Sequence, residues 1–141
     1  FQDGLGLFLK QDPAIVPLMM RDWDARSWIR TPQRAAEKFL GPRVNLSPGE
    51  FQEQLYPESA VVLFQHNPPF WRPPEKLKTP SLWLAGEKDA VVSVPGLRRS
   101  ARIFKGDFEL IPGAGHNLMD EQDHHQTAVL IHDWLLARGI E

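Results

Sequence analysis

The stretch Pro80-Ser-Leu-Trp-Leu-Ala-Gly-Glu-Lys-Asp89 decides the fold, together with a second stretch of similar design, Phe108-Glu-Leu-Ile-Pro-Gly-Ala-Gly-His116. Each contains a short apolar run bounded by proline or glycine, which is the pattern of a buried β-strand. A loop follows each run and carries one side chain suited to acid–base chemistry, Asp89 in the first loop and His116 in the second. We therefore predict strands at 81–85 and 108–111.

Helical patterns alternate with these two strands. One helix is predicted to begin at 94 and end near 106, and an amphipathic helix is predicted from about 122 to 138. The stripe of the second helix that faces the core is expected to hold Ala128, Ile131 and Leu135, with Gly139 as its left-handed cap. Strand, helix, strand, helix predicts an α/β fold with short parallel strands and flanking helices. Because ligands bind at the carboxyl ends of such strands, Asp89 and His116 are expected at one edge of the sheet.

The chain divides into two regions, 1–76 and 77–141. The first region is predicted to be α-helical, with helices at 13–22, 32–40, 48–56 and 57–65, and the residues from 66 to 80 form a proline-rich connector. These helices are short and apolar over broad faces, so they must pack on something. They are either a helical layer on the core or a lid over an apolar pocket, and we favour the lid.

Prolines mark the expected helix starts. Asp12-Pro13, Thr31-Pro32 and Ser47-Pro48 each place a capping side chain before a proline that can occupy the first helical position. Ser47 and Glu50 have the spacing of a capping box. Gly41 is expected to end the second helix in a left-handed conformation, and Pro17 is expected to kink or shorten the first.

Composition excludes several classes of function. The formal net charge of -2 gives no basic surface for a nucleic-acid backbone, so no nucleic-acid partner is expected. The chain has no cysteine, which excludes disulfides and thiolate metal sites. No apolar run approaches the roughly 20 residues that cross a bilayer, so no membrane span is expected.

Polar residues near the second loop resemble a metal site at first sight. They are Asp120, Glu121, Asp123, His124 and His125. Adjacent histidines on a helix point to different faces and cannot easily share an ion. We expect these residues to form a solvent-exposed first helical turn, with the acidic side chains at the positive end of the helix dipole. We predict neither a metal nor an organic cofactor. Trp83 is expected to be buried in its strand, and Ser93 to begin a helix.

The residues Leu-Ala-Gly-Glu-Lys-Asp89-Ala-Val-Val, then Ile-Pro-Gly-Ala-Gly-His116-Asn-Leu-Met, and a last helix ending Trp134-Leu135 resemble the C-terminal half of an α/β-hydrolase. In that family the catalytic acid follows the next-to-last core strand and the histidine follows the last. The resemblance implies a partial α/β-hydrolase fold, with 1–76 as its α-helical cap and 77–141 as the C-terminal part of its core. It also implies that Asp89 and His116 are the acid and base of a Ser-His-Asp type triad.

The third member of that triad does not occur in these residues. The family places its nucleophile on a Gly-x-Ser-x-Gly turn ahead of the cap, and no serine of this sequence has that setting. The sequence therefore predicts part of an esterase-like acyl hydrolase for a small apolar acyl substrate, inactive on its own. The same acid and base also serve epoxide, halide and C–C bond hydrolysis. The expected partner is the missing N-terminal half or a second copy of the chain. The alternative is a non-catalytic interaction module or swapped oligomer built from such a fragment.

Overall fold

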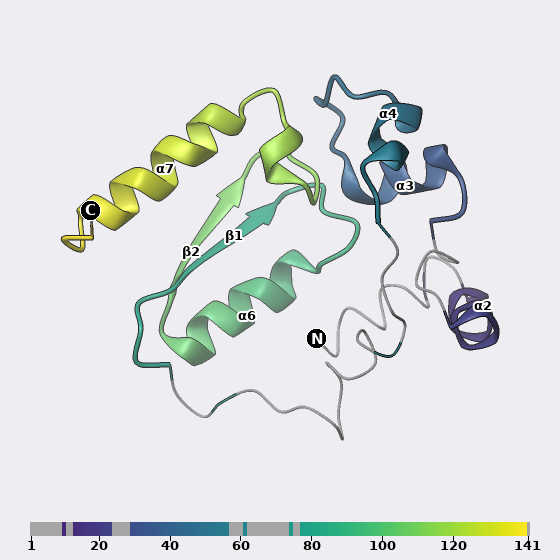
Figure 1. Ribbon diagram of the computed structural model, residues 1–141. Helices are drawn as coiled ribbons and strands as arrows, with labels where there is room; N and C mark the ends of the chain where they lie inside the picture. The colour runs from purple at the N-terminus through teal and green to yellow at the C-terminus, as the bar shows by residue number, and fades with distance from the viewer. Residues whose placement is uncertain are drawn as a thin grey trace.

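The structure, a computed structural model, describes residues 10, 13–23, 29–56, 61, 74 and 77–140 of the 141-residue chain. Its C-terminal part is a strand–helix–strand–helix unit, and two short helices lie beside the carboxyl ends of the strands (Figure 1). Within the described residues the sheet has two parallel strands, so the architecture is of mixed α/β character. No helix in this described part is long and apolar enough to cross a membrane.

The two strands form where the apolar runs predicted them. β1 spans Leu82–Gly86 and β2 spans Asp107–Ile111. They pair in parallel over their whole lengths, with Leu82 opposite Asp107 and Gly86 opposite Ile111. Helix α6, Val94–Phe104, makes the crossover between them. The predicted parallel arrangement is confirmed; β1 lies one residue later than predicted at both ends, and β2 begins one residue earlier.

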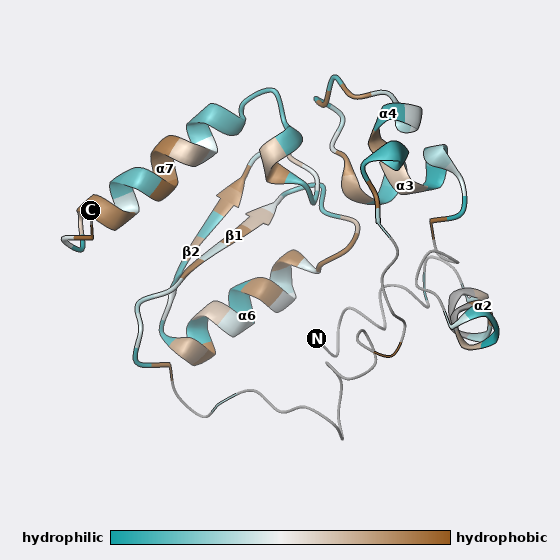
Figure 2. Cartoon of the chain, viewed as in Figure 1, coloured by the Kyte–Doolittle hydropathy of each residue, from teal (hydrophilic) through white to brown (hydrophobic). Residues whose placement is uncertain are grey.

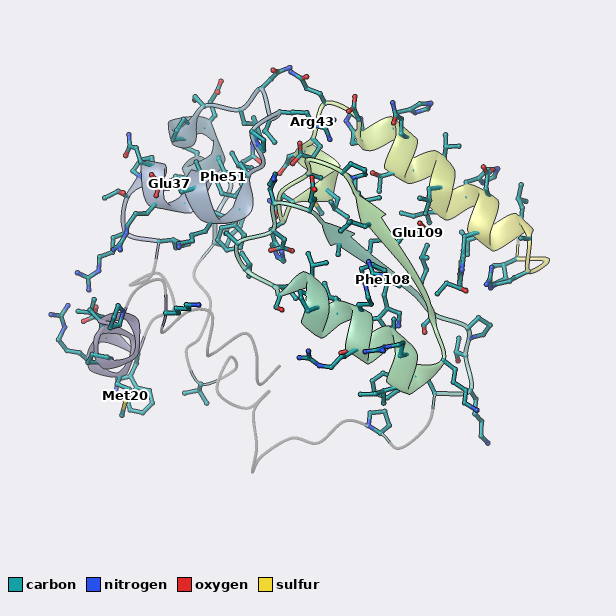
Figure 3. All side chains as sticks on the ribbon, turned by 180° about the vertical axis from the view of Figure 1, so that it is seen from behind. Met20, Glu37, Arg43, Phe51, Phe108 and Glu109 are labelled. Atoms are coloured by element: carbon teal, nitrogen blue, oxygen red, sulfur yellow. The ribbon has the colours of Figure 1, made fainter. Side chains whose placement is uncertain are left out.

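The sheet carries one helix on each face. Phe108 faces α6, because the guanidinium of Arg98 lies over its ring at 4.3 Å from the centroid. Its neighbour Asp107 points to the other face and accepts hydrogen bonds from Trp134 Nε1 (2.8 Å) and from Arg138. Both donors belong to the C-terminal part of the chain, where α7 spans His124–Leu136. Figures 1 and 3 show α6 and α7 on opposite sides of the strands.

The inward face of α7 differs from the predicted stripe. Ala128 and Ile131 are exposed, and only Leu135 of the predicted stripe is half-buried. Thr127 is buried and Trp134 is half-buried. The reason is the hydrogen bond from Trp134 to Asp107, which turns that face of the helix towards the sheet. Figure 2 shows a hydrophilic first turn and hydrophobic residues beyond it, several of them facing outward. Gly139 closes the helix as predicted, with φ +66 and its N–H donating to Leu136 O.

Small side chains make the tightest contacts. The described apolar residues that are fully buried are four alanines and one phenylalanine: Ala35, Phe51, Ala85, Ala101 and Ala114. Alanines allow the backbones to approach closely, as between α6 and β1. Trp83 is half-buried rather than buried, and its ring stacks on Phe104 with centroids 5.9 Å apart. Its indole N–H needs a partner, Ser81 Oγ at 3.1 Å, which keeps it near the edge of the core.

Two of the N-terminal helices begin at the predicted caps. α3 spans Pro32–Phe39, and Thr31 Oγ1 accepts from Arg34 N. α4 spans Pro48–Glu53 behind a complete capping box between Ser47 and Glu50. The rings of Phe39 and Phe51 join the two helices, with centroids 6.0 Å apart. Figure 3 shows Phe51 between them.

The first helix begins later than predicted. α2 spans Ile15–Asp22, with Ala14 as a cap residue whose side chain makes no capping bond. Pro17 therefore falls in the first turn, where its missing N–H has no helical acceptor to lose. Shortening, one of the two outcomes expected of Pro17, is what occurs. Of the helix predicted at 57–65 only residue 61 is described, and of the proline-rich connector only 74 and 77–80 are described.

Two glycines serve close packing rather than a left-handed turn. Gly41 does not adopt positive φ, and α3 ends in extended backbone at Leu40. A Cβ atom on Gly41 would lie 2.0 Å from Glu121 Oε1, so the site requires glycine for space. At the end of α6 the left-handed residue is Lys105, with φ 55. Gly106 beside it gives room to Ser81, whose Oγ would lie 2.3 Å from a Cβ.

Candidate active site

Asp89 and His116 lie at the carboxyl ends of adjacent strands, as the strand pattern predicted. Two backbone hydrogen bonds tie the loops together, from Glu87 N to Ile111 O at 3.0 Å and from Lys88 N to Ala114 O at 2.8 Å. The loop after β1 then turns back on itself, because Asp89 N donates to Gly86 O. The two side chains are therefore held by neighbouring, mutually bonded loops.

The carboxylate of Asp89 divides its oxygens between backbone and imidazole. Oδ1 accepts the N–H groups of Val91 and Val92, each at 2.8 Å. Oδ2 lies 3.0 Å from Nδ1 of His116. The side chain is only 4% exposed, so water competes little for either oxygen. This arrangement fixes the carboxylate before it meets the histidine.

The contact with Asp89 sets the tautomer of His116. An ionised carboxylate only accepts, so Nδ1 must carry the proton that lies between them. In a neutral imidazole Nε2 then has a free lone pair and can take a proton from another group. The side chain is 31% exposed, and no residue in the described part of the chain bonds to Nε2. His116 thus has the orientation of a general base held by an acid.

Phe39 contributes to the site from α3. Its ring meets the imidazole of His116 edge-on, with centroids 5.6 Å apart and an interplanar angle of 60°. Its carbonyl oxygen accepts from Asn117 N at 2.9 Å. One residue of the N-terminal region therefore contacts both the imidazole and the backbone next to it.

Glycines make the close approach of the loops possible. A Cβ atom on Gly86 would lie 2.0 Å from Gly115 O, and one on Gly115 would lie 2.3 Å from Gly41 N. Gly113 has φ +71, which side chains tolerate poorly. Gly86, Gly113 and Gly115 thus allow the two loops to lie close together.

The polar cluster after His116 is only in part the solvated helix start that was predicted, because His124 and His125 are exposed but Glu121 is buried. Glu121 is 2% exposed, and its Oε1 accepts from Gly115 N at 2.6 Å. Asp123 pairs with Arg43, while Asp120 accepts from Asn117 Nδ2 at 3.0 Å. The prediction that Glu121 faces solvent is wrong, because the backbone at Gly41 packs against its carboxylate. Among the described residues, no group of three His, Asp or Glu side chains could hold a metal ion.

Three of the four serines in the described ranges have structural partners. Ser47 and Ser93 cap helices, as predicted for Ser93, and Ser81 accepts from Trp83 Nε1. No serine in the described ranges forms a hydrogen bond with His116. The nucleophile that a triad requires is thus not found in the part of the chain that the structure describes.

Sequence reasoning found Asp89 and His116 but missed Phe39 and Glu121. Phe39 ends an amphipathic helix, and nothing in its sequence setting distinguishes it from an ordinary core residue. Glu121 stands among other acidic residues, which favours a surface interpretation. The only related feature in the sequence is the glycine at 41, far from Glu121 along the chain. Its missing side chain leaves the volume that the Glu121 carboxylate fills.

Comparison of the chain with protein-family models, with curated proteins and with solved structures finds no match.

Proposed function

We propose that this chain supplies the acid and base of an acyl hydrolase of the α/β-hydrolase type. The observation that carries the proposal is the 3.0 Å contact between Asp89 and His116 at the ends of adjacent parallel strands. His116 would take the proton of an attacking hydroxyl through Nε2 and return it to the leaving group. Asp89 would hold the tautomer and stabilise the imidazolium.

The nucleophile would come from polypeptide outside these 141 residues. The sequence has no Gly-x-Ser-x-Gly turn. The described sheet has only two parallel strands, which is small for such a fold. Parallel strands normally lie within a wider sheet that has helices on both faces. We infer that the missing group is contributed either by a joined segment or by a second chain. The substrate would be a small apolar ester or related acyl compound.

A fluorophosphonate probe, which reacts with activated serines, tests the proposal. The protein would be purified from its source with whatever polypeptide accompanies this chain, labelled, digested and mapped by mass spectrometry. We expect an adduct on a serine outside the 141 residues, together with turnover of p-nitrophenyl butyrate. His116→Gln should abolish both, whereas His132→Gln should change neither, because His132 is an exposed histidine on α7.

Three results would contradict the proposal. They are no adduct at all, an adduct on a serine of this sequence, or equal labelling of the His116→Gln protein and the wild type. Size-exclusion chromatography distinguishes the enzyme from the alternative role, a non-catalytic interaction module. A stable homodimer that neither labels nor hydrolyses esters would favour the interaction module over the enzyme.

A further inference from the structure

The loop that carries His116 is tied to the rest of the protein at each of three consecutive residues. Gly113 N donates to Glu87 Oε2 at 2.9 Å, and Ala114 O accepts from Lys88 N. Gly115 N donates to Glu121 Oε1 at 2.6 Å. Two of the three residues are glycines, which lose the most conformational freedom when they are ordered. Such a loop holds a fixed shape only if contacts from outside impose it.

The hydrogen bond from Gly115 to Glu121 differs from the other two because its acceptor is a buried carboxylate. Glu121 is 2% exposed, whereas Glu87 is exposed. A hydrogen bond to a buried, charged acceptor is stronger than one on the surface, since water does not compete for it. It also acts on the residue immediately before His116.

A strap of chain, residues 39–45, encloses this carboxylate. Gly41 lies against it and against Gly115, where a Cβ would be 2.0 Å from Oε1 and 2.5 Å from the amide nitrogen. Val44 pairs with Glu121 in an antiparallel bridge. Arg43 donates to Pro112 O at 2.8 Å, so the strap also contacts the histidine loop at its first residue. The strap therefore closes over Glu121 from several directions.

The position of Glu121 is costly for stability alone. Its second oxygen, Oε2, is buried and has no hydrogen-bond partner among the residues that the structure describes. An unsatisfied buried carboxylate oxygen destabilises the folded state, and an apolar side chain of the same size would avoid that cost. A buried carboxylate with an unsatisfied oxygen, placed next to the loop of His116, calls for an explanation, and a role in the site supplies one.

We propose that Glu121 is a positioning residue for His116. By holding Gly115 N–H it fixes the backbone from which the imidazole extends, so that Nδ1 stays in line with Asp89 and the ring stays against Phe39. Its effect on catalysis rests on the proposed function. Its effect on the Asp89–His116 hydrogen bond does not.

Glu121→Met separates positioning from simple stabilisation. Met fills a similar volume without an acceptor, so we expect the urea midpoint of this variant to match or exceed that of the wild type. The NMR signal of the His116 Nδ1 proton, protected by its bond to Asp89, should nevertheless broaden or disappear. In the complete enzyme kcat for p-nitrophenyl butyrate should fall about 10- to 100-fold with KM nearly unchanged, as for a misplaced catalytic group.

Glu121→Gln is the rescue variant, because its amide carbonyl can still accept from Gly115 N. It should restore the proton signal and bring kcat to within about threefold of the wild type. Glu109→Gln makes the same chemical change at an exposed position of β2 and should alter nothing. If Glu121→Met does not fold, the Gln variant decides the matter, since loss of the proton signal in a folded Gln protein would contradict the proposal.

A wild-type proton signal and kcat in folded Glu121→Met would overturn the positioning role. Failure of the hydrolase proposal gives a different pattern. His116→Gln would then leave activity unchanged, while the NMR comparison of the Glu121 variants would still report whether Glu121 orders His116.

Discussion

Gly41 and Gly115 lie against each other, although they belong to opposite parts of the chain. A Cβ on Gly41 would be 2.5 Å from Gly115 N, and one on Gly115 would be 2.3 Å from Gly41 N. We predict that Gly41→Ala lowers the free energy of unfolding by about 1–3 kcal/mol, because backbone must shift to admit the methyl group. Urea unfolding measures this loss.

Gly49 provides the matched control for that substitution. It lies in α4, and a Cβ there would meet nothing within 4 Å. Gly49→Ala should therefore raise the free energy of unfolding by roughly 0.5–1 kcal/mol, since alanine is the better helix former. Equal effects of the two substitutions would show that the close approach at Gly41 does not govern stability.

Asp89→Asn tests the tautomer of His116. The amide oxygen can still accept from Val91 N and Val92 N, so the loop should keep its shape. The amide N–H₂ would then face Nδ1 and drive the ring proton to Nε2, which could no longer act as a base. In the proposed hydrolase, kcat/KM for p-nitrophenyl butyrate should drop about 10⁴-fold. Asp133→Asn on α7 serves as the control, and retention of activity by Asp89→Asn would exclude the assigned role.

Lys105 occupies a left-handed conformation at the end of α6, with φ 55. Glycine adopts this conformation without the steric cost of a side chain. We predict that Lys105→Gly raises the melting temperature and that Lys105→Ala does not. Differential scanning calorimetry of the two variants provides the comparison, and a lower melting temperature for the glycine variant would refute the argument.

The capping box of α4 should make stability depend on pH. Ser47 lowers the pKa of Glu50 below its ordinary value, because its hydroxyl and then its backbone N–H donate to the carboxylate. A lowered folded-state pKa contributes stability above the unfolded-state value, about 4.3, and that contribution is lost as pH falls through the folded value. The melting temperatures of wild type and Glu50→Gln should differ most at neutral pH and converge in acid. A difference in melting temperature that stays the same at all pH values would contradict this role of the Glu50 carboxylate.

Local sequence signals predicted what depends on local chemistry. Proline and glycine bounded both apolar runs, so the strands and their order followed, and Thr31 and Ser47 marked helix starts through their side chains. The loop positions of Asp89 and His116 followed from the strands. The structure shows these two residues hydrogen-bonded, while their catalytic role stays a prediction.

Features that depend on distant contacts could not be predicted from the sequence. Gly41 appeared to be a left-handed cap because the carboxylate that fills its side-chain volume comes from Glu121, far along the chain. The inward face of α7 was misjudged because hydrophobicity favoured Ile131, whereas a hydrogen bond from Trp134 to Asp107 orients the helix. In both cases a polar contact with a residue distant in sequence outweighs the local signal.

The strap and the histidine loop are far apart in sequence although they touch in the structure, and this implies an order in which the parts fold. Asp89 and His116 are 27 positions apart, whereas Arg43 reaches Pro112 across 69 positions. Closing the longer loop costs more chain entropy, so the strand–helix–strand unit should form first and the strap should dock late. Substitutions in the strap should then accelerate unfolding while leaving the folding rate almost unchanged. His116 would acquire its final surroundings only in the last step of folding.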